Sequence, residues 1–134
     1  MQKNKKALVY CSIGLGDGLL FLMISNNLSN NGYNVDTFHP FLHELNNWFD
    51  YTKIKPLFLE SEIFQILQNY DLIIFNSDYS ALNKKFKEIA FSKFKDKTYE
   101  LHPCTCRGRE FLGSFKFDLK KSILLNFEDF LKKF

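Results

Sequence analysis

Cysteine is scarce in this sequence. The chain has only three cysteines, Cys11, Cys104 and Cys106, and the last two are separated by a single residue. Disulfide frameworks use an even number of cysteines at characteristic spacings, and neither condition is met here. The pattern therefore argues against a small disulfide-rich secreted domain and favours a reducing compartment.

Long apolar runs are also missing. The nearest candidate, residues 18–24, ends at the polar residues 25–27. A membrane-spanning helix needs roughly 18 apolar residues. The basic residues 1–6 precede an apolar stretch that is too short for a signal peptide, and no small-residue cleavage site follows it. We therefore expect no transmembrane segment and a cytoplasmic location.

The composition supports one folded domain. Hydrophobic residues make up 46% of the 134 residues and aromatic residues 17%, including sixteen phenylalanines. A chain with this content can bury a sizeable core and is not of the disordered class. Residues 1–80 hold five Lys/Arg against eight Asp/Glu, whereas residues 81–134 hold thirteen against seven. The basic part could face an anionic partner or form a solvated face, and no nucleic-acid-binding motif accompanies it.

Hydrophobic patterning indicates alternating strands and helices. Strands are predicted at 6–12, 33–40, 54–59, 71–78 and 97–101, and helices at 17–31, 41–49, 60–70, 80–94 and 121–133, with 102–118 irregular. This alternation predicts a single Rossmann-like α/β domain over residues 1–134, with a mainly parallel sheet and helices on both faces. Ligands of such sheets bind at the carboxyl ends of the strands. The turns at 14–18, near 39 and at 76–78 should therefore lie close together.

Two of the predicted helices also carry predicted apolar faces. The helix at 41–49 should bury one side, formed by Leu42, Leu45, Trp48 and Phe49. The helix at 121–133 should bury Ile123, Leu124, Phe127, Phe130 and Leu131. Gly32 is a natural stop for the helix at 17–31.

The glycine-rich stretch SIGLGDGLLFLM, residues 12–23, allows three interpretations. The first is a dinucleotide fingerprint, with Asp36 twenty residues after Gly16 as the ribose-binding acid. Against it, the third glycine falls one position early, and Asp17 would compete with a pyrophosphate for the positive end of the helix. A P-loop is excluded because no Gly-Lys-Ser/Thr follows.

The other two interpretations concern Asp17 itself. Aspartate caps helices well, and the glycines alone would explain a tight turn. Alternatively, Asp17 is a general base at the mouth of the sheet, where the helix dipole favours its ionised form and it could accept a proton from a sugar hydroxyl. The flanking glycines would then allow a bulky substrate to approach the backbone closely.

The segment Ser12-Ile13-Gly14-Leu15-Gly16-Asp17, after a strand and before the apolar helix GLLFLM, resembles the N-terminal motif of the heptosyltransferase-like glycosyltransferases, glycosyltransferase family 9. Gly16 and Asp17 match the glycine–aspartate pair of that family, so the resemblance implies that Asp17 is the catalytic base. The helix lacks the proline that the family usually has there. The family has the two-domain GT-B fold, and this chain has room for only one domain. The resemblance therefore implies an acceptor-binding half without its donor-binding half.

This resemblance implies a function and a set of partners. The reaction would transfer a sugar from a nucleotide sugar to a hydroxyl of an anionic saccharide acceptor, in lipopolysaccharide or other surface polysaccharide assembly. A separate donor-binding polypeptide or self-association would complete the enzyme, no cofactor is implied, and the site would lie in the cytoplasm or at the periphery of the inner membrane. Besides Asp17, the expected substrate-binding residues are Gly14, Gly16, Gly18, His39, Asn76 and Asp78. The alternatives are a non-catalytic remnant or binding module with the same fold, and a nucleotide-binding oxidoreductase half.

The segment LHPCTCR holds one further candidate site. His102, Cys104 and Cys106 lie within five residues, and thiolates and imidazoles are ligands of zinc. Structural zinc sites usually use C-x2-C spacing and four ligands, so an ordinary reduced loop is the alternative. Arg107 and Arg109 could pair with an anionic group of an acceptor.

Overall fold

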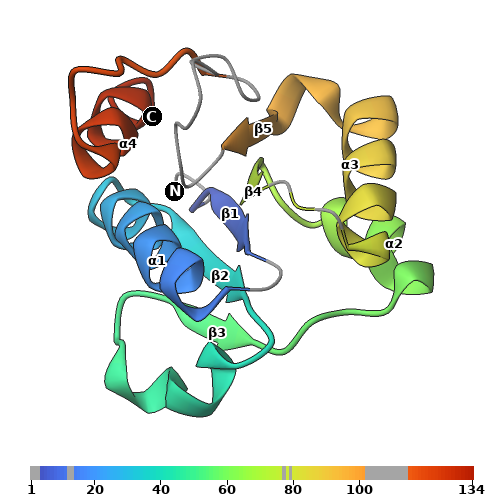
Figure 1. The fold of residues 1–134 in the computed structure, drawn as a ribbon. Coiled ribbons are helices and arrows are strands. Elements are labelled where there is room, and N and C mark those ends of the chain that lie inside the picture. The colour runs from blue at the N-terminus through green and yellow to red at the C-terminus, as the bar shows by residue number, and fades with distance from the viewer. Residues whose placement is uncertain (1–3, 12–13, 77, 79, 102–114) are drawn as a thin grey trace.

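Five parallel strands form the centre of the computed structural model, which describes residues 4–11, 14–76, 78, 80–101 and 115–134. They occur in the spatial order β3-β2-β1-β4-β5 (Figure 1). The strands are β1 (Lys6–Tyr10), β2 (Asn34–Phe38), β3 (Lys53–Lys55), β4 (Leu72–Asn76) and β5 (Thr98–Leu101). This is the order of a Rossmann-type sheet, so the predicted α/β fold class is confirmed.

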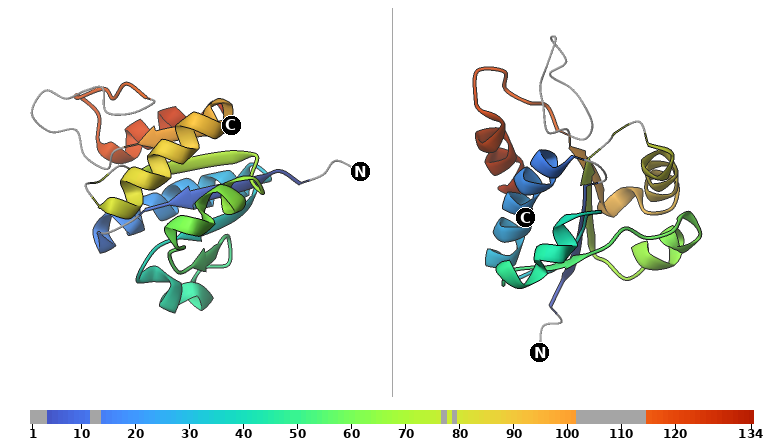
Figure 2. Two further views of the ribbon diagram at one scale, coloured as in Figure 1. Left: turned by 90° about the vertical axis from the view of Figure 1, so that its right-hand side faces the viewer. Right: turned by 60° about the horizontal axis from the view of Figure 1, so that its bottom comes forward.

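Helices cover both faces of the sheet (Figure 2). On one face, α1 (Leu15–Asn30) packs beside α4 (Ile123–Leu131), with Phe21 of α1 against Phe127 of α4. On the other face lie α2 (Ile63–Leu67) and α3 (Ala81–Lys93), whose buried side chains include Leu67 and Phe86. None of the described helices combines the length and apolar character needed to cross a bilayer.

The two central strands are buried from end to end. Residues 7–10 of β1 have no exposed surface, and all five residues of β4 are buried. Parallel strands covered on both faces need such continuous apolar runs, which explains why the sequence identified them clearly. The edge strand β3 is shorter than predicted and ends before Pro56, which cannot donate to a strand ladder.

Helix α1 ends at a left-handed glycine, as predicted. Gly32 has φ +93°, and its N–H donates to the carbonyl of Ser29 at 3.0 Å. The N–H of Tyr33 donates to the carbonyl of Leu28 at 3.0 Å. This pair of bonds satisfies carbonyls that the helix end would leave without partners.

The segment after β2 differs from its prediction. It forms a 3-10 helix, η1 (Leu42–Trp48), with non-helical angles at Leu45 (φ −100°, ψ 16°). Leu42 is buried against Leu22 and Ile54, but Trp48 is 78% exposed. Leu45 and Phe49 pack, partly buried, against the same cluster, so the predicted face is confirmed for these residues and wrong for Trp48.

Two further helices are shorter or more exposed than predicted. The segment 60–70 divides into a 3-10 turn, η2 (Glu60–Glu62), and the single-turn helix α2. A second 3-10 turn, η3 (Lys95–Lys97), follows α3. In α4 the predicted core residues Phe127, Phe130 and Leu131 are buried, whereas Leu124 is 46% exposed. Ile123, in the same turn of α4, packs against the core, so Leu124 lies on the exposed side of the helix.

Candidate functional site

The chain turns in opposite directions after β1 and after β4, which pair side by side. Tyr10 at the end of β1 lies opposite Phe75 of β4. From this edge β1 continues into α1 on one face of the sheet, and β4 continues into α3 on the other (Figure 1). This is the topological switch point, where α/β sheets of this kind open a crevice for ligands. It brings the turns at 14–18 and 76–78 to the carboxyl ends of adjacent strands.

The carbonyl of Gly14 anchors the first of these turns. Gly14 is the N-cap of α1, and its oxygen accepts the N–H of Gly18 at 2.9 Å. The same oxygen lies 3.0 Å from Nε2 of His39, which follows β2. The start of α1 is therefore tied both to its own helix and to the neighbouring strand.

His39 makes this tie with a side chain that has no exposed surface. Its Nδ1 accepts the backbone N–H groups of Phe41 and Leu42, each at 3.1 Å. Since Nδ1 acts as an acceptor, Nε2 carries the ring hydrogen and donates it to Gly14. Both ring nitrogens are thus occupied by backbone groups. The contact with substrate that the sequence suggested for His39 would require it to leave these bonds.

The surroundings of His39 favour its neutral form. Burial lowers the pKa of His39, the hydrogen bond to the Gly14 carbonyl opposes that shift, and the nearby His43 adds to the lowering. A protonated ring would lose the acceptor at Nδ1 and leave two backbone N–H groups without a partner. The geometry of the turn therefore depends on a neutral imidazole.

The three glycines of the turn have different surroundings. A Cβ at Gly18 would lie 2.5 Å from Cδ2 and Nε2 of His39 and 2.9 Å from Cδ1 of Leu42, so only glycine fits there. Gly18 is buried, and its place in the structure is a packing position beneath the turn. A Cβ at Gly16 would meet nothing within 4 Å, which leaves this part of the backbone open to an approaching molecule.

Asp17 occupies the first turn of α1 and is partly exposed. Its Oδ2 lies 3.1 Å from the position of a Cβ on Gly14, so the carboxylate leans over the N-cap glycine. Within the part of the chain that the structure describes, the side chain has no hydrogen-bond or ion-pair partner. The positive end of the helix dipole favours a negative charge at this point. Asp17 is therefore an accessible acceptor for the proton of a hydroxyl.

The turn after β4 is held by Asn83, from the first turn of α3. Its Nδ2 donates to the carbonyl of Asn76 at 2.6 Å, and its Oδ1 accepts the N–H of Asp78 at 3.1 Å. Asn76 is itself buried. Sequence analysis missed Asn83, although it stands three residues after the N-cap Ser80, at the spacing of a capping box.

Asp78 has one occupied oxygen and one that lacks a partner. Its Oδ1 accepts the N–H of Ser80 at 2.7 Å. Its Oδ2 is shielded from solvent and has no hydrogen-bond partner among the described residues. Buried polar atoms are almost always satisfied, so an oxygen of this kind calls for an explanation such as a bound ligand. The switch point thus carries an accessible carboxylate, Asp17, and a second one, Asp78, whose unpartnered oxygen is shielded from solvent.

The candidate ribose-binding acid lies elsewhere. Asp36 is in the middle of β2, where its Oδ2 accepts the hydroxyl of Tyr70 at 2.7 Å and pairs with Nζ of Lys55 at 3.1 Å. Burial and the hydrogen bond to Asp36 raise the pKa of Tyr70. Because Asp36 does not reach the carboxyl edge of the sheet, the structure gives no support to the dinucleotide interpretation of the glycine turn.

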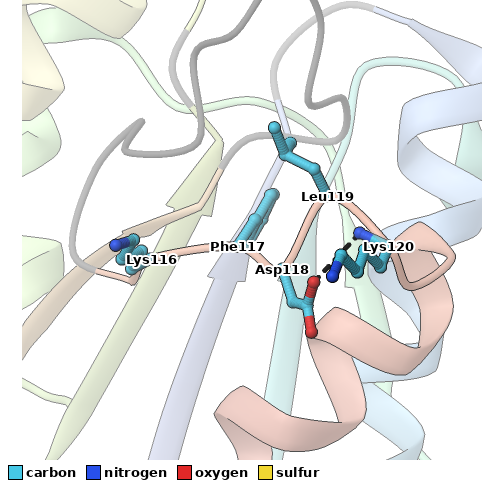
Figure 3. A pocket seen from close by; sticks show the side chains of 5 residues that line it. All are labelled: Lys116, Phe117, Asp118, Leu119 and Lys120. Carbon is cyan, nitrogen blue, oxygen red and sulfur yellow. Dashed lines mark hydrogen bonds between the residues drawn. The ribbon is translucent and has the colours of Figure 1, made fainter.

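Residues 116–120, the segment that precedes α4 in the chain, line a pocket of about 440 Å³ (Figure 3). Phe117 and Leu119 project to one side of this segment, and Asp118 accepts the N–H of Lys120 at 2.9 Å. Of the predicted site residues that the structure describes, none lines this pocket. The described ranges also hold no group of three or more His, Cys, Asp or Glu arranged to bind a metal. The candidate ligands His102, Cys104 and Cys106, and Arg107 and Arg109, lie outside the described residues.

No protein-family model matches the chain, and no curated protein matches it. The function is therefore inferred from the residues at the switch point. These residues offer an accessible carboxylate at Asp17, an open stretch of backbone at Gly16, and a turn that His39 holds in place.

Proposed function

We propose that this chain is the acceptor-binding domain of a heptosyltransferase-like glycosyltransferase, with Asp17 as the general base. The observation that carries the proposal is the position of the Asp17 carboxylate. It stands at the switch point of a Rossmann-type sheet, without a partner among the described residues and beside open backbone at Gly16. The match of Gly16 and Asp17 to the glycine–aspartate pair of that family adds support from the sequence.

The proposed reaction uses Asp17 as a proton acceptor. A hydroxyl of the acceptor sugar donates to the carboxylate, and its oxygen attacks the anomeric carbon of a nucleotide sugar. The bond from that carbon to the nucleoside diphosphate breaks, the diphosphate leaves with the bonding electrons, and the proton remains on Asp17. A positioned base of this kind typically contributes about 10²–10⁴-fold to the rate.

The other residues of the site take supporting roles in the proposal. Asp78, next to Asn76 at the end of β4, contacts the acceptor only if its shielded Oδ2 becomes exposed on binding. His39 and Gly18 hold the turn that presents Asp17. The nucleotide sugar is held by a second unit, either a separate polypeptide or another copy of this chain. The product belongs to surface polysaccharide assembly, at the cytoplasmic periphery of the inner membrane.

The test compares Asp17→Asn with a matched control. Asp96→Asn changes another exposed aspartate in the first turn of a helix, η3, which precedes β5 and lies outside the site. Transfer from UDP-, GDP- and ADP-activated sugars to uronic acid-containing oligosaccharides is followed by mass spectrometry. Binding of the same oligosaccharides is followed by saturation-transfer NMR. Asp17→Asn should lower the rate of transfer by at least about 100-fold. Asp96→Asn should leave the rate unchanged, and both variants should keep the unfolding midpoint of the wild type.

Three results separate the alternatives. Transfer that survives Asp17→Asn contradicts the role of Asp17 as base. Saccharide binding without any transfer, when a donor-binding unit is also supplied, favours a non-catalytic binding module with this fold. The absence of both binding and transfer in the wild-type protein rejects the proposed function.

A further inference from the structure

Phe41 is an exposed aromatic side chain at the carboxyl edge of the sheet. It follows β2 directly after His39 and Pro40, and it is 61% exposed. Its backbone N–H donates to Nδ1 of His39, and the two rings lie 6.0 Å apart at 63°. The backbone and the ring of Phe41 therefore both contact His39, whose two ring nitrogens are bonded to backbone groups.

Two consecutive contacts connect Phe41 to the candidate base. Its ring packs edge-to-face against His39, and His39 is bonded to the carbonyl of Gly14. Gly14 is also the residue whose Cβ position lies 3.1 Å from Oδ2 of Asp17. Leu15, which follows Gly14, is 52% exposed and adds a second apolar side chain to the same turn. The site therefore combines exposed apolar surface with a carboxylate acceptor.

This combination matches the chemistry of a sugar ring. A pyranose presents a face of C–H groups that can lie against an aromatic ring, and a rim of hydroxyl groups that can donate to carboxylates. A flat apolar protein surface would instead strip water from the carboxylate of Asp17 without supplying hydrogen-bond donors, which is costly for a charged group. A phosphate-rich ligand would be repelled by the same carboxylate.

We infer that Phe41 is a stacking platform for a pyranose ring of the acceptor and contributes to acceptor specificity. The inference rests on the proposed function and adds a contact outside the resemblance to the glycosyltransferase family. The ring lies against the C–H face of one sugar, while a hydroxyl group of the same saccharide reaches Asp17. The contact acts on affinity for the acceptor and leaves proton transfer to Asp17.

The test measures saccharide binding by saturation-transfer NMR with variants at Phe41. The probes are the methyl glycosides of glucose, galactose and mannose, and glucuronic acid as the anionic member. Phe41→Ala should weaken binding about tenfold, equivalent to about 1.4 kcal/mol, whereas Phe41→Trp should retain it. The matched control is Phe64→Ala, because Phe64 is 45% exposed on α2, over the other face, with its ring against Phe94. In the wild type, saturation should be strongest on the C–H protons of one ring face.

The outcomes distinguish this inference from the proposed function. Binding that Phe41→Ala leaves unchanged overturns the platform, while the role of Asp17 stands or falls on the transfer assay. Self-association of the wild type that Phe41→Ala abolishes, measured by sedimentation, also overturns it and identifies the ring as a protein contact. Failure of every monosaccharide probe to bind the wild type overturns the platform, whereas the proposed function is decided by binding of, and transfer to, the oligosaccharides. Equal unfolding midpoints for Phe41→Ala and the wild type would show that weaker binding by the variant is not caused by unfolding.

Discussion

Gly18→Ala tests the packing that holds the candidate base in place. Alanine normally stabilises the interior of a helix by about 1 kcal/mol relative to glycine. Here the added Cβ would stand 2.5 Å from the ring of His39 and 2.9 Å from Leu42, and both side chains are buried. The clash can be relieved only by moving His39 away from Gly14 or by shifting α1 away from the sheet.

The cost follows from these contacts. Overpacking a buried position costs about 1–3 kcal/mol. Displacing His39 also leaves the backbone N–H groups of Phe41 and Leu42 without their acceptor. The loss of such a partner costs about 1–3 kcal/mol of unfolding free energy. After subtracting the gain in helix propensity, the expected loss of unfolding free energy is about 2–4 kcal/mol.

The assay is urea unfolding followed by far-UV circular dichroism. With a slope of about 2 kcal/mol per molar urea, the midpoint should fall by about 1–2 M with an unchanged slope. The matched control is Gly16→Ala in the same helix, where a Cβ meets nothing within 4 Å and the change should stay within about 1 kcal/mol. Equal stabilities for the two variants would refute the packing argument. Truncating His39 to alanine should reduce the penalty of Gly18→Ala, which a double-mutant cycle measures.

Two further predictions concern the residues that hold the two turns. Because the pKa of His39 is lowered below 6.5 in the folded protein, the unfolded state binds more protons, so stability is complete above about pH 6.5 and is lost as the pH falls below it. The unfolding free energy should fall more between pH 7.5 and pH 5.5 in the wild type than in His39→Gln. An equal fall in both proteins would contradict the requirement for a neutral His39. Asn83→Ala should cost about 2–4 kcal/mol, because the carbonyl of Asn76 and the N–H of Asp78 lose their partner. Asn83→Asp keeps the acceptor and should cost less in the same urea assay, whereas an equal cost would contradict the bonding scheme.

The central strands of the sheet could be predicted because positions buried on both faces are occupied by apolar residues. β1 and β4 are apolar along almost their whole length, since both of their faces are covered. The end of α1 was predictable for a similar reason, because a left-handed residue there favours glycine. Trp48 was misplaced because the kink at Leu45 depends on backbone angles that the residue types do not specify.

The structural role of His39 could not be predicted from residue types. All three hydrogen-bond partners of its imidazole ring are backbone groups, which every amino acid other than proline supplies alike. A histidine before a proline is compatible with a surface turn, a cap or a substrate contact. Only the approach of α1 to the end of β2, made possible by Gly18, distinguishes these cases.

The most direct test of the central claim is amide chemical-shift mapping of a saccharide on the ¹⁵N-labelled chain. Titration with glucuronic acid and the methyl hexosides should shift the amides of Gly14, Gly16, Asp17, Phe41 and Asp78, which lie at the carboxyl ends of β1, β2 and β4. Amides of η3 at the opposite edge of the sheet should remain unchanged. Saturable shifts confined to the first group would support an acceptor site at the switch point. Shifts centred elsewhere, or no shifts at all, would contradict it.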